Sequence, residues 1–364
     1  MTSLRVAVIG HGKLGSIHAR LLHEAEDFEL TVVADPIAGN RQLASDTLSV
    51  PTTPNITQLM SDFDCAIIAT PTVFHHQVAK TLLQNGKHVL IEKPITATLA
   101  EARELVALAD ARDLILQVGH VVRFDHRFQA AQQIIRSPRL IECRRASGYT
   151  FRSMDVGVTL DLMIHDLDLV LALVNSPIVE IQAVGSPVIG PHEDVAHARL
   201  TFENGALANL SASRASYQQV RSLQATGPFG FVDVNFMEDS ITTVGIGESL
   251  RQLDIDPVRA TEETKLDITE RFFTELLPRT TLTPKPCNAI AEEHKDFFVS
   301  ITEKSTPRVS GETGLQVLEV AKRISDLIQS GASTEQAVTG GPHFNASGTR
   351  ADRRSIHRSG VRGL

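Results

Sequence analysis

The sequence of 364 residues lacks a long apolar run, an excess of basic residues and a cluster of cysteines. No apolar run approaches the roughly 18–20 residues that a membrane-spanning helix needs. Strand-like sequence begins at Leu4, which leaves no room for a signal peptide. The formal net charge is -8, so a protein dedicated to nucleic-acid binding is not expected.

The cysteines of the chain are scattered. Cys65, Cys143 and Cys287 match no metal-ligand spacing, so we expect no bound metal ion. Cysteines that are not arranged in pairs suit a reducing compartment, and we therefore predict a cytoplasmic protein. A chain of this length is expected to form two domains, or one large domain with an appendage.

Short apolar runs alternate with helical stretches over residues 1–120. Nearly continuous apolar strands between helices are typical of a parallel sheet that is covered on both faces. We therefore predict a doubly wound α/β domain. The expected strands are Leu4–Ile9, Leu30–Ala34, Ala66–Ala69, His88–Ile91 and Leu114–Val118, and the expected helices include Leu14–Glu24, Gln77–Leu83 and Leu99–Ala111.

After residue 123 the pattern changes to helices and then to runs in which polar and apolar residues alternate. The alternation predicts an antiparallel sheet with one buried face, and Asn204-Gly205 between two such runs is a strong hairpin signal. The expected helices of this part are Asp125–Ile135, Leu160–Val174, Cys287–Thr302 and Glu312–Gln329.

These changes divide the chain into an expected Rossmann domain of residues 1–122, an α+β domain of residues 123–332 and a tail of residues 333–364. Periodicity is lost from Gly331 onward. The tail is rich in Gly, Ser and Arg and has little to bury, so we expect it to be disordered.

Gly10, Gly12 and Gly15 form a Gly-x-Gly-x-x-Gly motif directly after the first strand and at the start of a helix. In a dinucleotide-binding turn the first Gly allows a tight turn, the second lets a pyrophosphate approach the backbone, and the third lets the helix pack closely. The N–H groups of the helix N-terminus then hold the phosphates. A glycine turn without a ligand is the alternative. The cofactor residues expected in this turn are Gly10, His11, Gly12, Lys13, Leu14 and Gly15.

The second strand ends on Asp35, where a carboxylate can accept hydrogen bonds from a ribose 2′-hydroxyl. The same carboxylate would repel the 2′-phosphate of NADP, so we predict NAD(H), with NADP(H) less favoured. Arg41 is the only obvious basic residue that could favour NADP.

Thr70-Pro71 follows the predicted strand Ala66–Ala69, and His75 opens the next helix. Ligands of open α/β sheets lie at the carboxyl ends of the strands, so these residues are expected to border the cofactor. A tight-turn proline and a surface histidine explain them equally well. We also assign Glu92 and Gln117 to cofactor binding.

The stretch "KHVLIEKPIT" is a buried strand that stops on Glu92-Lys93-Pro94, at the same edge of the sheet. Pro94 cannot continue the ladder, and a cis peptide bond before it would turn Lys93 into the crevice. A lysine beside a nicotinamide ring can hydrogen-bond a substrate hydroxyl and favour its alkoxide. The alternative is a surface Glu-Lys pair at a strand end.

The stretch "TLDLMIHDLDLVLALV" is apolar almost all round, which indicates a buried helix. Asp161, His165 and Asp168 lie at i, i+4 and i+7 and form one polar stripe. Buried polar groups need partners, so they either satisfy one another or line a wet pocket. A histidine with a carboxylate one turn away is a suitable general base. A structural network and a catalytic group are equally good interpretations.

Over residues 4–330 the chain resembles the glucose–fructose oxidoreductase / inositol dehydrogenase (Gfo/Idh/MocA) family. The resemblance is carried by the glycine motif, Ala-Thr-Pro followed by His75, Glu92-Lys93-Pro94, and Asp161 four residues before His165. The resemblance implies a Rossmann domain followed by an α/β domain with an open, mostly antiparallel sheet that commonly mediates oligomers. It also implies NAD(P)-dependent oxidation or reduction at a sugar or cyclitol carbon. Lys93, Asp161 and His165 are then the expected catalytic residues, with Lys93 and His165 facing the substrate.

The stretch "QVGHVVRFDHRF" resembles the G-H-x-x-R-F-N-P segment of bacterial enzymes that oxidise UDP-N-acetylglucosamine, or its uronate, at C3. It departs from that pattern at Asp125-His126. Arg123 could instead pair across the domain junction. The expected substrate-binding residues are Lys93, His120, Arg123, Tyr149, Asp161 and His165.

We therefore predict a dehydrogenase in which His165 takes the proton of a sugar hydroxyl and Lys93 stabilises the alkoxide. A dehydrogenase of free sugars or inositols is an alternative, and so is a non-catalytic nucleotide-binding protein on the same fold. We expect a homodimer or homotetramer that forms through the second sheet, with no nucleic-acid or membrane partner.

Overall fold

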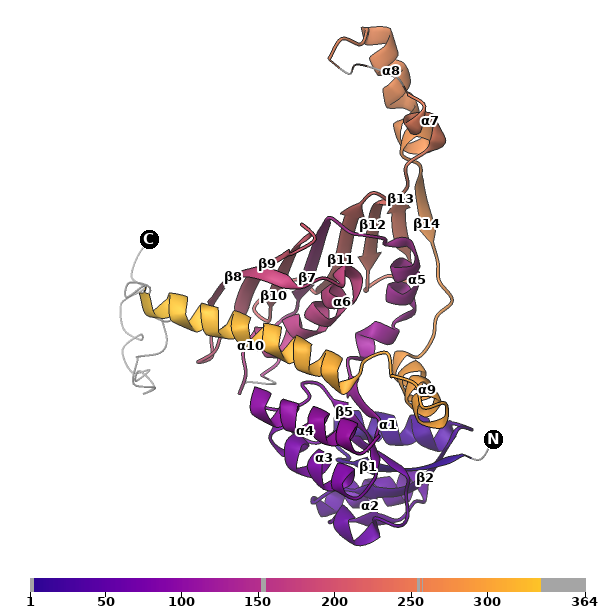
Figure 1. Ribbon diagram of the computed structural model, residues 1–364, viewed down its shortest axis with the longest axis vertical. Helices are drawn as coiled ribbons and strands as arrows, with labels where there is room; N and C mark the ends of the chain where they lie inside the picture. Colours follow the sequence, from indigo (N-terminus) through magenta and orange to yellow (C-terminus); the bar gives the residue numbers. More distant parts are fainter. Residues whose placement is uncertain (1–2, 152–154, 254–255, 257, 335–364) are drawn as a thin grey trace, which may run out of the picture.

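The computed structural model describes residues 3–151, 155–253, 256 and 258–334, and Figure 1 shows two sheets joined by helices. The first sheet has 6 parallel strands in the order β3-β2-β1-β4-β5-β6, which confirms the doubly wound domain. Its strands are β1 (Leu4–Ile9), β2 (Phe28–Ala34), β3 (Thr52–Thr53), β4 (Cys65–Ile68), β5 (His88–Glu92) and β6 (Leu116–Gly119). Its α-helices are α1 (Lys13–Glu24), α2 (Ala38–Leu48), α3 (His75–Gln84) and α4 (Leu99–Ala111).

The order of the strands reverses direction between β1 and β4. In such a sheet the loops at the carboxyl ends of the strands separate at this point and leave a crevice for ligands. The short 3-10 helices η1 (Ile56–Leu59), η2 (Thr72–Phe74) and η3 (Val121–Phe124) follow β3, β4 and β6. The fold therefore brings the ends of β1, β2, β4 and β5 to one edge.

The second sheet has 8 strands in the order β14-β13-β12-β11-β7-β10-β9-β8. Its neighbours are antiparallel except for the parallel pair β7 and β10, which confirms an open, mostly antiparallel sheet. Gly205 has φ +81° in the turn between β9 and β10, so the predicted hairpin is confirmed. The strands are β7 (Leu140–Ala146), β8 (Ile178–Ser186), β9 (Val195–Phe202), β10 (Leu207–Ser213), β11 (Val220–Gly227), β12 (Gly230–Asn235), β13 (Ile241–Val244) and β14 (Arg279–Leu282).

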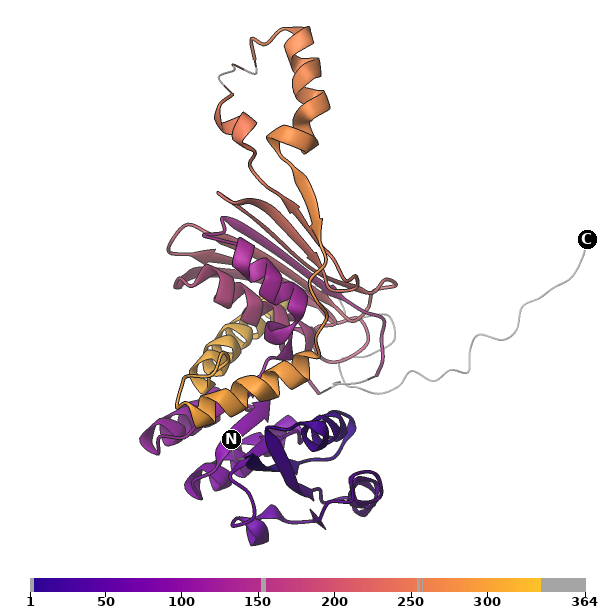
Figure 2. The ribbon, with the colours of Figure 1, turned by 90° about the vertical axis from the view of Figure 1, so that its right-hand side faces the viewer.

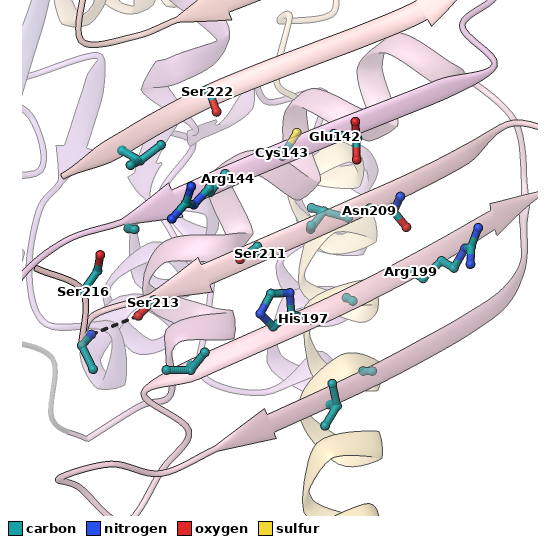
Figure 3. Close-up of a pocket in the computed structure, with 18 of the residues that line it drawn as sticks. Glu142, Cys143, Arg144, His197, Arg199, Asn209, Ser211, Ser213, Ser216 and Ser222 are labelled. Atoms are coloured by element: carbon teal, nitrogen blue, oxygen red, sulfur yellow. Dashed lines mark hydrogen bonds between the residues drawn. The ribbon is translucent and has the colours of Figure 1, made fainter. Parts of the chain in front are cut away.

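Helices cover one face of the second sheet and leave the other open, as the view along the sheet in Figure 2 shows. The covering helices are α5 (His126–Ile134), α6 (Ile164–Val174), which continues a π-helical turn over Thr159–Met163, and α10 (Gly311–Thr334). Burial alternates along β10, so every second side chain enters the core beneath α6. The open face carries polar side chains, including Glu142, Arg144, His197 and Arg199 (Figure 3).

The chain returns to the first domain near its end. Phe297 and Phe298 of α9 (Ala289–Thr302) are buried in one core cluster with Val6, Val8 and Leu30. Helix α9 lies within the expected second domain of residues 123–332, and it packs against the core under β1 of the first sheet. Periodicity alone could not reveal this, since it reports which face of a helix is apolar and not which neighbour covers it.

Two further differences from the sequence-based expectation lie late in the chain. An arm between β13 and β14 contains α7 (Glu248–Arg251), α8 (Glu262–Arg271) and a π-helical turn over Phe272–Leu276, and it projects away from the first domain (Figure 1). No residue of α8 is buried, so the helix has no apolar face packed on the core. Helix α10 continues past Gly331 to Thr334, and the expected tail from residue 335 onward lies outside the described residues.

Within the described ranges, no helix is both long enough and apolar enough to span a bilayer.

Candidate active site

The glycine-rich turn has the geometry that its sequence predicts. Gly10 has φ +92°, which favours glycine, and a Cβ added at Gly15 would lie 1.8 Å from the Gly10 carbonyl oxygen. A Cβ added at Gly12 would meet no atom within 4 Å. The first and third glycines are therefore required by the turn itself, whereas Gly12 leaves open space in front of α1.

The N-terminus of α1 faces this open space. Among the described residues no side chain caps the helix, and Lys13 and Leu14 are exposed beside it. Uncapped N–H groups with the positive end of the helix dipole form an anion site. A pyrophosphate therefore fits between Gly12 and the first turn of α1.

Asp35 lies at the end of β2 and binds the same turn. Its carboxylate accepts hydrogen bonds from the N–H of His11 at 2.7 Å and of Ile37 at 2.8 Å, and from Asn40 Nδ2 at 3.1 Å. Burial alone would raise the pKa of Asp35, but these hydrogen bonds hold it below its ordinary value. Asp35 is therefore ionised at neutral pH, and its negative charge remains at the end of β2. Arg41 Nη1 donates to the carbonyl oxygens of Asp35 and Pro36.

His75 is a buried residue and not a surface histidine. Its Nε2 lies 2.9 Å from the Thr70 carbonyl oxygen, and its Nδ1 lies 3.0 Å from that of Pro94. The ring therefore ties the end of β4 to the end of β5. Thr70 and Pro71 form the turn after β4, and the exposed Val73 and Phe74 follow them.

Lys93 is held across the junction between the two domains. The Lys93-Pro94 peptide bond is cis, and Lys93 Nζ donates to the Asp161 carbonyl oxygen at 2.8 Å. The nearer Asp161 carboxylate oxygen lies 3.8 Å from Nζ. Burial lowers the pKa of Lys93, although the charges of Asp161 and Glu92 oppose that shift. The end of β5 thus meets the π-helical turn before α6, which rules out a merely exposed Glu-Lys pair.

His165 and His120 lie near Lys93 and have unsatisfied ring nitrogens. His165 Nδ1 and both ring nitrogens of His120 are buried without a hydrogen-bond partner among the described residues. Burial, followed by the charges of Lys93 and Arg145, holds the pKa of His165 well below its ordinary value. Burial likewise lowers the pKa of His120. At neutral pH both rings are uncharged, so each can accept a proton or a hydrogen bond from a ligand.

Arg123, which the sequence led us to expect either at the substrate or in a pair across the domain junction, forms an ion pair with Asp168 of α6. Its Nε and Nη2 donate to the Asp168 carboxylate at 2.9 and 2.5 Å, and both side chains are buried. The Asp168 carboxylate is therefore bound by Arg123. Asp125, where the sequence departs from the family pattern, accepts a hydrogen bond from Arg127 N at 2.9 Å as the N-cap of α5.

Tyr149 lies on the loop after β7 with its ring against Phe151 and the Arg214 guanidinium. Its assignment to substrate binding stays a prediction.

Glu92 and Gln117 belong to a buried polar cluster behind the crevice. His18 Nε2 lies 2.8 Å from Glu92 Oε1, and His18 Nδ1 lies 2.8 Å from His294 Nε2. Gln117 Nε2 donates to the Glu293 carbonyl oxygen at 3.1 Å. Both carboxylate oxygens of Glu293 are buried without a partner, and burial and then the charge of Glu92 raise the pKa of Glu293 well above its ordinary value.

This cluster joins the first domain to α9. The possible ligand atoms of His18, Glu92 and Glu293 all lie within 4.8 Å of one another. These three described residues could therefore hold a metal ion. The roles of Glu92 and Gln117 in cofactor binding stay predictions.

The sequence did not single out Arg145, Asp166 or Arg221. Arg145 of β7 donates to the Asp166 carboxylate at 2.6 to 3.2 Å, and both side chains are buried. The signal was present in "LIECRRA", because a charged residue at an inward position of a strand needs a buried partner. Its partner on α6 lies next to His165.

Comparison with known proteins agrees with this geometry. Residues 4–120 match a model described as an oxidoreductase family with an NAD-binding Rossmann fold. Residues 117–232 match the GFO/IDH/MocA C-terminal domain. The chain is 30% identical over 325 residues to a UDP-N-acetylglucosamine 3-dehydrogenase of Acidithiobacillus ferrooxidans, covering 89% of this chain and 97% of that protein.

Solved structures show the same arrangement of domains. The crystal structure of the Acidithiobacillus ferrooxidans enzyme superposes with a TM-score of 0.79 at 29% identity, over 91% of this chain and 99% of that one. A scyllo-inositol dehydrogenase from Lactobacillus casei with bound NAD(H) and scyllo-inositol has a TM-score of 0.70 at 19% identity, over 91% and 98% of the two chains. The second likeness concerns the fold alone.

Proposed function

The chain belongs to the Gfo/Idh/MocA family of NAD-binding oxidoreductases, and we propose that it transfers a hydride between NAD and the C3 position of a nucleotide sugar. The observation that carries the proposal is the meeting of Lys93, from the end of β5, with Asp161 and His165, from the helix that covers the second sheet. The substrate class rests on the similarity to a UDP-N-acetylglucosamine 3-dehydrogenase. An inositol or free sugar is the alternative, because a structural neighbour holds scyllo-inositol.

The residues at the carboxyl edge of the first sheet fit the cofactor. The open space before Gly12 and the uncapped N-terminus of α1 would hold the pyrophosphate, and the ionised Asp35 would accept from the adenosine ribose. Thr70 and Pro71 would border the cofactor from the end of β4. NAD, when bound, supplies the hydride acceptor for oxidation of the sugar.

The chain's own groups handle the proton. His165 is neutral at neutral pH, so it can take the proton of the reacting hydroxyl as a general base. Lys93 carries a positive charge at the place where the alkoxide develops, and the Asp161 carbonyl oxygen fixes its ammonium group. Asp161 therefore orients Lys93, and His120 offers an unsatisfied ring to another polar group of the sugar.

A substitution of Lys93 tests this assignment. Lys93→Met should lower turnover by about 10²–10⁴, the usual range for a positioned proton-transfer or polarising group. NAD binding, measured by fluorescence titration, should change little, because the phosphates are held at Gly12. Turnover is measured as NAD reduction with UDP-N-acetylglucosamine, its uronate and a set of inositols.

The matched control is Lys80→Met, since Lys80 is a partly exposed lysine of α3 that pairs with Glu104. Normal turnover in a folded Lys93→Met protein would remove Lys93 from the reaction. A non-catalytic nucleotide-binding protein would show NAD binding without turnover of any of these compounds.

We also propose that two copies of the chain pack through the open face of the second sheet. This face is hollowed between β8, β9, β10 and β11, and its polar side chains point away from the covering helices (Figure 3). The unpaired cysteines Cys65, Cys143 and Cys287 support a cytoplasmic setting.

A further inference from the structure

Arg145 and Arg221 face each other across neighbouring strands. The antiparallel register of β7 and β11 pairs them directly, so both side chains leave the sheet on the same face. Arg145 identifies that face, because its guanidinium binds Asp166 on α6. The two arginines therefore lie on the helix-covered side of the sheet, which is also the side of His165.

Only Arg145 forms an ion pair, although the charge of Asp166 also acts on Arg221, whose side chain is exposed. Asp166 binds Arg145, whereas no described side chain forms an ion pair or a side-chain hydrogen bond with Arg221. Like charges directly opposite each other on a sheet are destabilising. Burial, and then the charge of Arg145, lowers the pKa of Arg221. The arrangement thus leaves a guanidinium whose charge would be favourably neutralised by an anion.

This guanidinium lies close to the reacting groups. The positive charges of Arg145 and Arg221 both act on His165, and that of Arg145 also acts on Lys93. Arg145 is held by the residue that follows His165 on α6, so its place relative to the general base is fixed. A substrate whose hydroxyl lies between Lys93 and His165 would bring its other groups toward Arg221.

We propose that Arg221, which lies opposite Arg145 on the neighbouring strand, binds an anionic group of the substrate. The inference rests on the proposed function and narrows its substrate class to acidic sugars, with either a carboxylate on the ring or the diphosphate of a nucleotide. Both anions accept the two parallel N–H donors of a guanidinium. A neutral inositol has no group for this site, so Arg221 discriminates between the two substrate classes.

The test compares Arg221→Gln and Arg221→Lys with the unmodified protein in the presence of NAD. Dissociation constants are measured by calorimetry for UDP, UDP-N-acetylglucosamine, its uronate and uncharged N-acetylglucosamine, and turnover is measured for the three sugars. Arg221→Gln should weaken binding of the charged ligands by about 10- to 100-fold, as expected for loss of a hydrogen bond to a charged group. Arg221→Lys should restore part of it, and N-acetylglucosamine should bind all three proteins alike.

The pattern of losses identifies the anion. Weaker binding of the uronate alone shows a carboxylate site, and weaker binding of UDP and both nucleotide sugars shows a diphosphate site. Equal binding of every charged ligand by Arg221→Gln and the unmodified protein would overturn the inference, and so would failure of the unmodified protein to bind any of them. Arg20→Gln is the matched control, because Arg20 is an exposed arginine of α1 whose one partner among the described residues is Glu24.

The same experiment separates the two proposals. Turnover of a nucleotide sugar by the unmodified protein tests the proposed function, whereas the ratio of binding constants between variants tests Arg221. Binding of UDP that depends on Arg221 without any turnover would support the anion site and count against the dehydrogenase.

Discussion

At the scale of single residues, the candidate site depends on polar groups that the protein leaves unsatisfied. His165 Nδ1 and both ring nitrogens of His120 have no described partner, whereas Arg123, Asp168 and His75 are fully engaged with protein groups. Groups without a partner are available to a ligand, and leaving them so in a folded protein costs free energy. This difference separates residues that can bind a substrate from residues whose polar groups are already bound within the protein.

The first prediction at this scale concerns pH. Because burial and nearby cations hold the pKa of His165 well below 6.5, the base is already unprotonated at neutral pH. For sugar oxidation, kcat/KM should therefore fall only as pH drops through that pKa, and the acidic limb should lie below pH 6.5. A pH profile recorded by NAD reduction checks this. His165→Ala should lose the limb together with most of the turnover, and an unchanged limb in that variant would assign it to another group.

The second prediction concerns the choice of cofactor. The ionised Asp35 should make NAD the better cofactor by several-fold in kcat/KM, because its charge repels a 2′-phosphate. Arg41 lies against the Asp35 carbonyl oxygen, so Arg41→Ala should lower the remaining activity with NADP and leave KM for NAD nearly unchanged. Steady-state kinetics with both cofactors measures this. A several-fold preference for NADP in the unmodified protein would contradict the assignment.

At the scale of elements, α9 is fixed to the first domain by a buried polar cluster as well as by its apolar face. If Glu92 is ionised, it accepts from His18 Nε2, so His18 Nδ1 must accept from His294 Nε2 on α9. Phe297 and Phe298 pack on the same side of the helix, against the core under β1. The hydrogen-bond chain therefore sets the rotation of α9, and the apolar contacts hold it in place.

Glu293 of α9 gives a prediction about stability and pH. Its pKa is raised in the folded state by burial and by the charge of Glu92, so the folded protein holds its proton more tightly than the unfolded chain does. This contribution to stability is fully present below the unfolded pKa of about 4.5 and is lost as pH rises through the folded pKa. In the unmodified protein the free energy of unfolding should therefore fall from mildly acidic to alkaline pH, and in Glu293→Gln it should fall less.

Urea unfolding of the two proteins across that range is the measurement. Parallel curves would show that Glu293 does not hold a proton in the folded state. Stabilisation by Zn²⁺ or Mn²⁺ that Glu293→Gln abolishes would show that His18, Glu92 and Glu293 bind a cation instead.

At the scale of the whole molecule, the two domains meet where the chemistry is expected. Lys93 comes from the first sheet, and Asp161 and His165 come from the helix that covers the second. Helices α9 and α10 connect the domains again after the second sheet is complete, with Phe297 in the first core and Ile324 in the second. A change in the angle between the domains would separate Lys93 from Asp161, so the double connection supports the site.

The open face of the second sheet gives the prediction at this scale. If a second copy covers it, Val184→Glu should weaken the oligomer, because Val184 is 66% exposed in one chain and lines the hollow of that face. Val179→Glu is the control, since Val179 is exposed on the same strand but is not among the residues that line the hollow. Molar mass from light scattering, over a range of protein concentrations, is the measurement. Equal masses for Val184→Glu and the unmodified protein would exclude this face as the interface.

The sequence by itself determined the features that depend on local spacing. Gly10 and Gly15 are needed for a single turn, and the strands of the first sheet are short apolar runs. The period of 3.6 residues predicted Asp161 and His165 on one side of a helix, although Asp161 lies in the π-helical turn before α6. Each of these signals lies within about 20 residues of sequence, where backbone geometry and burial act directly. They were sufficient to indicate the fold, the cofactor and the family.

Only the tertiary structure decided which distant residues meet. The register of β7 and β11 places Arg145 opposite Arg221, and α9 returns to the first core. Arg123 forms an ion pair with Asp168, which is 45 residues later in the chain. The sequence pattern indicates that a buried charge needs a partner but does not identify that partner. The choice of partner depends on strand order and on the packing of helices onto sheets. Helix α8 of the arm buries no residue, so the apolar pattern that indicated the other helices did not indicate this one.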